Sequence, residues 1–316
     1  MTTTATDTPS PVADMEGVFI VGVARSGTSL LKALLDGHPE LWVPPAESFA
    51  VDWCGERDPA AAFLALPRYD ALLPEGSEQR RSVEATLRER VTPGAGPTTA
   101  VLAFLEAMAH VQPPQQGARR WVEKTPKHLR SLPRFLADLG PGTRAVCVVR
   151  DPRAVLASQA RRWERGRTPQ GMRHFAKRWA TGDVLTRAFE EVHPGFLAVR
   201  YEDLVEGPES VMRTVATHLG ITWDPILVTP TRGGAPWGGN SSYGVEGAAA
   251  QVSDVSLKRY EQELDPALVR ELTRLLAPRM EGWGYDAQFR PAGPRRWWLE
   301  LSTRHAVLKA RRDWAD

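Results

Sequence analysis

The feature that most constrains this chain is an apolar run at residues 18–23 that leads into a small, glycine-containing loop and then into a helical pattern. Leucines recur at helical spacing between Leu30 and Leu35, so we expect a buried strand, a tight turn and a helix in that order. The backbone N–H groups of such a turn and the positive end of the helix dipole converge on one point, which favours an anion. The segment therefore predicts an α/β fold with a phosphate-binding loop.

The loop has the glycine spacing of a Walker A sequence with one difference. Gly22 and Gly27 stand at the glycine positions, but Thr28 occupies the place of the Walker lysine, and Arg25 is the cation of the loop. We therefore expect a phosphate-like ligand that is not held as a kinase holds the β- and γ-phosphates of ATP. The expected binding residues are Arg25, Ser26, Gly27, Thr28 and Ser29.

A second anion site is expected after the apolar run at residues 144–149. Arg150 ends this predicted strand, at the edge where α/β sheets place their ligands. Ser158 follows two helical turns later, and Arg162 one turn after that. Arginines together with a hydroxyl suit a phosphate monoester, so these three residues are candidates for a second phosphate site.

The remaining pattern predicts a three-layer, P-loop-like α/β domain with a central parallel sheet flanked by helices and a helical cap insertion. Residues 196–200 read as a third strand, and residues 121–122 as a short fourth one. We expect a disordered lead at residues 1–16, a single domain at 17–290 and a helical tail at 291–316. Within the domain, residues 50–118 would form the cap and the glycine-rich residues 229–250 a mobile loop.

Composition narrows the function classes. A net charge of +2 over 316 residues argues against nucleic acid or an anionic membrane as the main partner. Two cysteines make no disulfide framework, and no apolar run approaches the roughly 20 residues needed to span a bilayer. The N-terminus lacks the pattern of a signal peptide, and no His, Cys or carboxylate group has metal-ligand spacing. We expect a cytoplasmic protein without a metal.

Five motifs, in order and in register over about residues 18–220, resemble those of sulfotransferases that use 3′-phosphoadenosine 5′-phosphosulfate (PAPS), in the form found in tyrosylprotein and many bacterial members. They are the first loop, the Arg150–Ser158 unit, LDGHPE at residues 35–40, EKTPKH at 123–128 and RYEDL at 200–204. The resemblance implies that the first loop binds the 5′-phosphosulfate of PAPS. The second site would bind the 3′-phosphate of PAPS and of its product, 3′,5′-adenosine bisphosphate (PAP).

The resemblance also implies roles for individual residues. Arg25 would help to hold the phosphosulfate, and Lys124 would stabilise charge on the leaving oxygen. Glu47 would be the base for the acceptor, with His128 as the alternative, and Tyr201 would contact the nucleotide or pack in the core. Three residues of the glycine-rich segment would close over the cofactor by analogy, namely Asn240, Ser241 and Ser242.

The acceptor is left open as a hydroxyl or amine of a small molecule, a glycan or a lipid. Two other functions compete. The missing Walker lysine disfavours an ATP-dependent kinase of P-loop ancestry, and the presence of Glu47 and Lys124 disfavours a nucleotide-binding protein without catalysis. The sequence is compatible with a homo-oligomer but does not define the oligomeric state.

Overall fold

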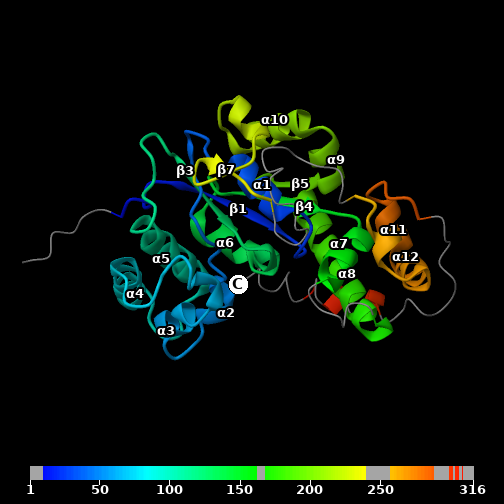
Figure 1. The fold of residues 1–316 in the computed structure, drawn as a ribbon, viewed down its shortest axis with the longest axis horizontal. Helices are drawn as coiled ribbons and strands as arrows, with labels where there is room; N and C mark the ends of the chain where they lie inside the picture. Colours follow the sequence, from blue (N-terminus) through cyan, green and yellow to red (C-terminus); the bar gives the residue numbers. More distant parts are fainter. Residues whose placement is uncertain are drawn as a thin grey trace, which may run out of the picture.

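The computed structural model describes residues 10–161, 168–239, 257–287, 299–301, 303–305 and 308. At its centre lies a five-stranded parallel sheet with the order β2-β3-β1-β4-β5 (Figure 1). The strands are β1 (Glu16–Gly22), β2 (Leu41–Trp42), β3 (Arg120–Lys124), β4 (Arg144–Val149) and β5 (Phe196–Arg200). The predicted α/β class with a parallel sheet is confirmed.

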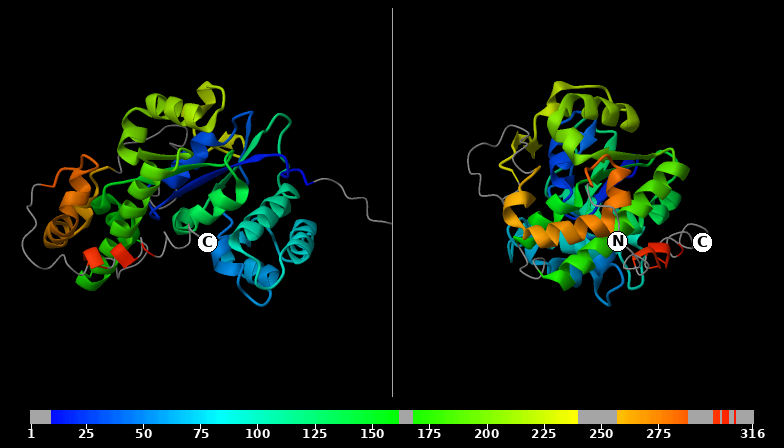
Figure 2. Two further views of the ribbon diagram at one scale, coloured as in Figure 1. Left: turned by 180° about the vertical axis from the view of Figure 1, so that it is seen from behind. Right: turned by 90° about the vertical axis from the view of Figure 1, so that its right-hand side faces the viewer.

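Apolar side chains on both faces of the sheet explain why its strands read as continuous apolar runs. Along β1, Phe19 and Val21 join one hydrophobic cluster, and Val18 and Ile20 join another. Figures 1 and 2 show α10 above the sheet and α8 with the cap helices below it. The helices of the main body are α1 (Thr28–Leu35), α6 (Leu132–Leu139), α7 (Pro152–Ala160), α8 (Pro169–Val192), α9 (Tyr201–Glu206), α10 (Pro208–Leu219), α11 (Tyr260–Glu263) and α12 (Pro266–Glu281).

The segment predicted as a cap forms a group of helices beside the sheet (Figure 1). Its elements are α2 (Ala50–Trp53), α3 (Pro59–Leu64), the 3₁₀ helix η1 (Pro67–Tyr69), α4 (Glu78–Arg90) and α5 (Pro97–Ala109). The ring of Phe63 packs against those of Tyr69, Trp53 and Phe104, with centroids 4.3, 5.5 and 6.0 Å away. These aromatic contacts join the short cap helices into one packed unit.

Two segments differ from the sequence prediction. Residues 11–14 of the predicted disordered lead form a turn in which Val12 is buried, and β1 already begins at Glu16. In the glycine-rich segment, β6 (Thr231–Arg232) and β7 (Ala235–Pro236) form a small antiparallel hairpin. The Thr231 hydroxyl donates to an Asp36 carboxylate oxygen at 2.7 Å, which ties this hairpin to the end of α1. Residues 240–250 lie outside the described part of the chain.

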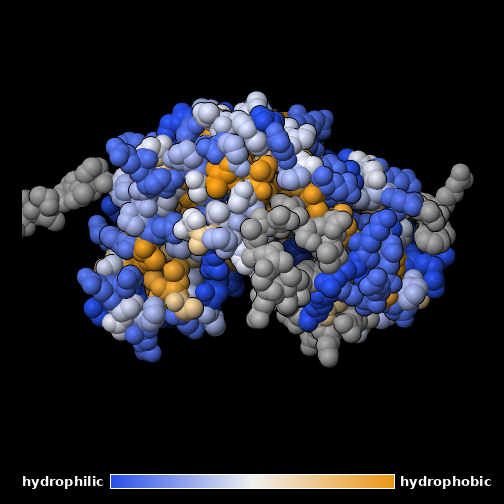
Figure 3. All heavy atoms as spheres, turned by 45° about the horizontal axis from the view of Figure 1, so that its top comes forward, coloured by the Kyte–Doolittle hydropathy of each residue, from blue (hydrophilic) through white to orange (hydrophobic). Residues whose placement is uncertain are grey.

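The visible surface is largely hydrophilic, with apolar areas near its centre and at its lower left (Figure 3). Among the described residues, the large apolar side chains that are exposed are Val192, Leu301 and Leu308. No described helix combines the length and the apolar character needed to cross a bilayer. In the predicted tail, Leu299 and Thr303 are buried, and Arg279 of α12 donates to the Thr303 hydroxyl at 3.4 Å.

Candidate active site

The loop between β1 and α1 is packed so closely that it requires glycine at two positions. Gly22 has φ 146°, and a Cβ there would lie 2.7 Å from the carbonyl oxygen of Val148 on β4. Gly27 has φ 104°, and a Cβ there would overlap the ring of Tyr201. Glycine is the residue that adopts positive φ without steric cost and lets backbone approach so closely. The glycine spacing seen in the sequence thus reflects real contacts with β4 and Tyr201.

The N-terminus of α1 supplies the donors that the sequence predicted. Gly27 caps this helix in a left-handed conformation without a side-chain cap, and Leu30 N donates to Gly27 O at 2.9 Å. The first N–H groups of an α-helix have no partner inside the helix, so they are available to an anion. Buried leucines hold α1 against the sheet, which keeps these N–H groups at the carboxyl ends of the strands.

Lys124 joins this loop to the predicted base. It is the last residue of β3, is 3% exposed, and donates from Nζ to the Ser29 hydroxyl at 3.2 Å. The same Nζ forms an ion pair with the Glu47 carboxylate, whose side chain is 28% exposed. Three separate elements, α1, β3 and the segment after β2, therefore bring Ser29, Lys124 and Glu47 together.

Glu123 holds the segment that carries Glu47. Its Oε1 accepts hydrogen bonds from Ser48 N at 3.1 Å and from the Ser48 and Thr125 hydroxyls at 2.9 and 2.6 Å. Its Oε2 lies 2.9 Å from His128 Nδ1. Burial alone would raise the pKa of Glu123, but the charge and hydrogen bond of His128 and the bonds from Thr125 and Ser48 lower that pKa to about 2. Glu123 is thus a buried anion that anchors the backbone next to Glu47.

His128, the alternative base, is fully buried in this arrangement. Its side chain is 0% exposed, one ring nitrogen faces Glu123, and the ring lies 5.1 Å from that of Phe135. A base for an incoming acceptor has to reach the acceptor proton directly or through one water. Of the two candidates, Glu47 has the exposure that this requires.

The second predicted anion site lies directly beside the first. Arg150 is 4% exposed at the end of β4, and its guanidinium lies 4.1 Å from the centroid of the Tyr201 ring. Ser158, on α7, is 1% exposed. Arg25 Nε donates to the Ser158 hydroxyl at 2.9 Å, and Arg150 Nη1 donates to Arg25 O at 3.3 Å. Arg25, at φ 79°, therefore links the two sites, and its side chain contacts the second of them.

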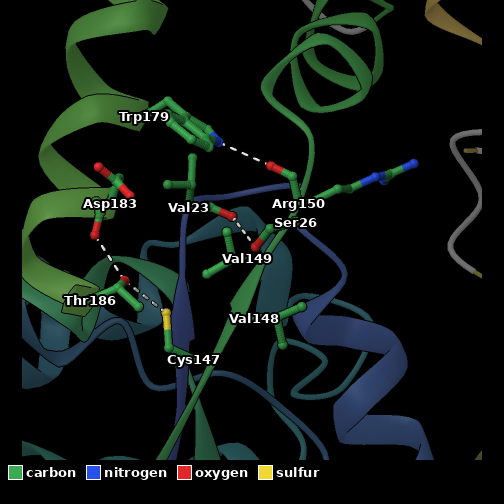
Figure 4. A pocket seen from close by; sticks show the side chains of 10 residues that line it. Val23, Ser26, Cys147, Val148, Val149, Arg150, Trp179, Asp183 and Thr186 are labelled. Carbon is green, nitrogen blue, oxygen red and sulfur yellow. Dashed lines mark hydrogen bonds between the residues drawn. The ribbon is translucent and has the colours of Figure 1, made fainter. Parts of the chain in front are cut away.

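A small cavity lies beside the end of β4, next to Arg150 (Figure 4). Its wall includes Val23, Cys147, Val149 and Trp179. The Trp179 indole N–H donates to the Arg150 carbonyl at 3.0 Å, while the Arg150 side chain extends away from the cavity (Figure 4). Trp179 thus holds the backbone of Arg150 at the end of β4.

The structure places most of the predicted site residues in one region. Among them, Tyr201 packs between Gly27 and Arg150, so it contacts both the loop and the second site.

The structure also adds Lys32, which the sequence analysis did not single out. Lys32 donates to the carbonyls of Pro44 and Ala46, just before Glu47. A lysine in the otherwise apolar pattern of residues 28–35 was the sequence signal for it. Four predicted residues lie outside the described part, namely Arg162, Asn240, Ser241 and Ser242.

The side chains around the loop suit a ligand with two separated anionic groups. Arg150, Ser158 and Lys124 are buried donors, and the Gly27 position leaves no room for a side chain against Tyr201. Within the described residues no group of three or more His, Cys, Asp or Glu side chains could hold a metal ion. Cationic and hydroxyl donors of this kind are chemically suited to phosphate and sulfate groups.

Comparison with known proteins defines the class. The model of the sulfotransferase family matches residues 17–225, well over half of the chain. The chain therefore belongs to the sulfotransferase family and is a PAPS-dependent sulfotransferase.

Individual relatives agree with this class. The chain is 29% identical to protein-tyrosine sulfotransferase 1 of Danio rerio over 292 residues, which cover 88% of this chain and 74% of the relative. It is 30% identical to protein-tyrosine sulfotransferase 2 of Gallus gallus over 312 residues, 94% of this chain and 76% of the relative. Its fold matches the sulfotransferase domain of the Synechococcus PCC 7002 olefin synthase with a TM-score of 0.60 at 20% identity, over 86% of this chain and 96% of the domain.

Proposed function

We propose that this sulfotransferase moves a sulfuryl group to an acceptor hydroxyl or amine, with Glu47 as the general base and Lys124 stabilising charge on the leaving oxygen. The observation that carries the proposal is the position of Lys124 Nζ, which contacts both Ser29 of the anion-binding loop and Glu47. A cation in contact with both the loop and the base lies between the expected donor and acceptor sides of the reaction.

The residues around the loop divide into binding and reaction roles. PAPS, when bound, supplies the sulfuryl group and a phosphate leaving group. The α1 N–H groups and the hydroxyls of Thr28 and Ser29 would hold the phosphosulfate, and Arg150 with Ser158 would hold the 3′-phosphate. Since sulfuryl transfer, like phosphoryl transfer, makes few covalent demands on the protein, positioning and charge neutralisation by these donors carry most of the catalysis.

Glu47 would accept the acceptor proton. A partly exposed carboxylate in contact with Lys124 can exchange part of this ion-pair contact for the acceptor hydroxyl. In that arrangement Lys124 stays next to the reacting centre and the proton moves to the Glu47 carboxylate. The buried position of His128 supports Glu47 over the alternative base.

The acceptor class is the open part of the proposal. A small molecule, a glycan or a lipid fits the sequence expectation, while the similarity to proteins named protein-tyrosine sulfotransferases, which extends over 88–94% of the chain, favours a peptide tyrosine. Because that similarity spans the cap as well as the loop, we place the tyrosyl hydroxyl first among the acceptors to test.

The test combines radiolabelled PAPS with four acceptors: a tyrosine-containing peptide, 4-nitrophenol, a chito-oligosaccharide and a fatty alcohol. We expect Glu47→Gln to lower kcat by about 100-fold or more, the scale of general-base catalysis. The Kd for PAP, measured by calorimetry, should stay within about twofold of wild type because Glu47 does not belong to the expected nucleotide site.

Arg150→Ala is the matched control, because this substitution should weaken PAP binding whereas Glu47→Gln should not. Loss of a charge-assisted contact to phosphate should weaken PAP binding by about 2–3 kcal/mol, or roughly 30- to 150-fold. Wild-type turnover in Glu47→Gln would remove Glu47 as the base. Unchanged PAP binding in Arg150→Ala would remove the assigned 3′-phosphate site.

A further inference from the structure

Lys32 is an unusual residue for its position. Helix α1 is otherwise built to pack, with six of its eight residues buried. Lys32 Nζ donates to Pro44 O at 2.7 Å and to Ala46 O at 3.4 Å. Within the described residues no carboxylate forms an ion pair with Lys32. Its ammonium is therefore directed at the backbone carbonyls of one segment, the one that leads to Glu47.

This placement is costly for a lysine. Burial, together with the positive charge of Lys124, lowers the pKa of Lys32 to about 8, although Glu47, Glu123 and Asp36 act in the opposite direction. An apolar side chain such as methionine would fill a similar space without removing a charge from water. A partly buried ammonium directed at two carbonyls is thus more than α1 needs for its own packing.

The segment that Lys32 contacts has few backbone hydrogen bonds available to it. It follows β2, which ends at Trp42, so it has no partner strand in the sheet. Pro44 and Pro45 have no N–H group, so these two residues can accept hydrogen bonds through their carbonyl oxygens but cannot donate any from the backbone. Two carbonyls of the segment, on Pro44 and Ala46, accept from Lys32.

The far side of Glu47 is held by other elements. The Tyr69 hydroxyl donates to Glu47 O, and Trp53 Nε1 donates to Ser48 O at 2.8 Å. Ser48 N donates to Glu123 at 3.1 Å. Hydrogen bonds from the cap and from Glu123 of β3 therefore hold residues 47–48, and hydrogen bonds from Lys32 of α1 hold residues 44–46.

We infer that Lys32 is a positioning residue for catalysis, which sets the place of Glu47 relative to the anion-binding loop through the carbonyls of Pro44 and Ala46. Lys32 lies three residues after Ser29, so the two share a face of α1. The helix that begins at the loop thus contacts Lys124 through Ser29 and the Glu47 segment through Lys32. This inference rests on the proposed role of Glu47 as the base.

The test compares Lys32→Met, Lys32→Arg and the exposed-lysine control Lys177→Met in the full chain. Amide hydrogen exchange of a peptide covering residues 41–53 reports the segment directly and needs no acceptor. We expect Lys32→Met to speed exchange there about tenfold or more, while Lys32→Arg and Lys177→Met stay within about threefold of wild type. Arginine keeps a charged donor that can reach two carbonyls, so its rescue separates positioning from mere packing.

Activity is measured as PAP formation from PAPS with 4-nitrophenol present, together with the Kd for PAP and the melting temperature. Lys32→Met should lower kcat about tenfold or more with Kd for PAP within about twofold. Wild-type kcat should fall as pH rises above about 8, where the ammonium deprotonates, and this fall should move to higher pH in Lys32→Arg. In a Glu47→Gln background, Lys32→Met should lower kcat by less than about twofold, because Lys32 acts through Glu47.

Each contrary outcome has a distinct meaning. Wild-type exchange at residues 41–53 in Lys32→Met, or an equal loss of kcat in both backgrounds, overturns the role of Lys32 while leaving Glu47 as the base. Parallel loss of PAP binding and melting temperature in Lys32→Met, without rescue by arginine, shows a structural role only. Full activity of Glu47→Gln overturns the proposed function itself and the inference with it.

Discussion

At the scale of single residues, the site depends on charges that are buried with specific partners. Glu123 accepts three hydrogen bonds on one oxygen and faces His128 with the other. Removing a carboxylate from water is unfavourable, so this arrangement persists only because the donors more than offset the loss of hydration. The role of Glu123 is to hold Ser48, and through it the backbone that presents Glu47.

The depressed pKa of Glu123 predicts a pH-dependent stability. The pKa is about 2 in the folded protein against an ordinary value of 4.5, so its contribution is fully present above pH 4.5 and is lost as pH falls toward 2. We expect Glu123→Gln to flatten this part of the dependence of unfolding free energy on pH, measured by urea denaturation.

The control for that experiment is the exposed carboxylate of Glu75, as Glu75→Gln. The free energy of unfolding of this variant should stay within about 0.5 kcal/mol of wild type across that pH range, because substitutions of exposed side chains usually change stability little. An unchanged slope in Glu123→Gln would show that Glu123 does not contribute to acid sensitivity.

At the scale of elements, the loop and α1 form the part of the fold on which the proposed cofactor binding depends. Gly27 ends the loop and caps α1 in a left-handed conformation, and it lies against the Tyr201 ring. The ring in turn lies under the Arg150 guanidinium. One turn thus connects the N–H groups of α1 with the second anion site.

We expect Gly27→Ala to impair both binding and folding. An alanine at this φ costs about 1 kcal/mol for the backbone, and overlap with Tyr201 adds to it. Since the loop has to shift, PAP affinity should fall at least about tenfold, as measured by calorimetry. Gly94→Ala is the matched control, because Gly94 also has positive φ (83°) but a Cβ there would have no atom within 4 Å. Wild-type PAP affinity in Gly27→Ala would contradict the close contact with Tyr201.

At the scale of the whole molecule, a buried aspartate joins α8 to the C-terminal part of the chain. Asp183, with 1% of its side chain exposed, pairs with Arg279 and Arg187 at 2.9 Å each. Trp283 Nε1 also donates to it, at 2.7 Å. Because α8 carries Trp179, which fixes Arg150 O, this contact connects the C-terminal helix α12 with the support of the site.

We expect Asp183→Asn to lower the free energy of unfolding by about 3 kcal/mol, because it leaves the partly buried Arg279 charge without its main partner. The measurement is urea denaturation at neutral pH. Glu209→Gln breaks the exposed pair with Arg213 and should change stability by less than about 0.5 kcal/mol. Equal effects of the two substitutions would contradict the assigned role of Asp183.

Local patterns in the sequence predicted the parts of the site that short segments determine. The apolar run, the glycine spacing and the leucine periodicity predicted a strand, a loop and a helix in this order. The structure has the strand at Glu16–Gly22 and the helix at Thr28–Leu35. The strand β3 was expected only at residues 121–122, yet it extends over Arg120–Lys124. The prediction was too short because Arg120, Glu123 and Lys124 are polar and do not continue the apolar run, although the fold buries them. The two-residue strand β2 has no periodicity to read, and only its pairing with β3 reveals it.

The sequence by itself determined the fold class and the strand, loop and helix at the start of the domain, because these depend on residue types at short, regular spacing. It offered Arg150 as a candidate for an anion site, and the resemblance to PAPS-dependent sulfotransferases suggested Glu47 and Lys124. Only the tertiary structure decided how these parts meet. It buried His128 on Glu123, brought Arg25 to Ser158, and placed Lys32 under the segment that carries Glu47. Such contacts join residues far apart in the chain, and their geometry depends on how the helices pack on the sheet rather than on any local pattern.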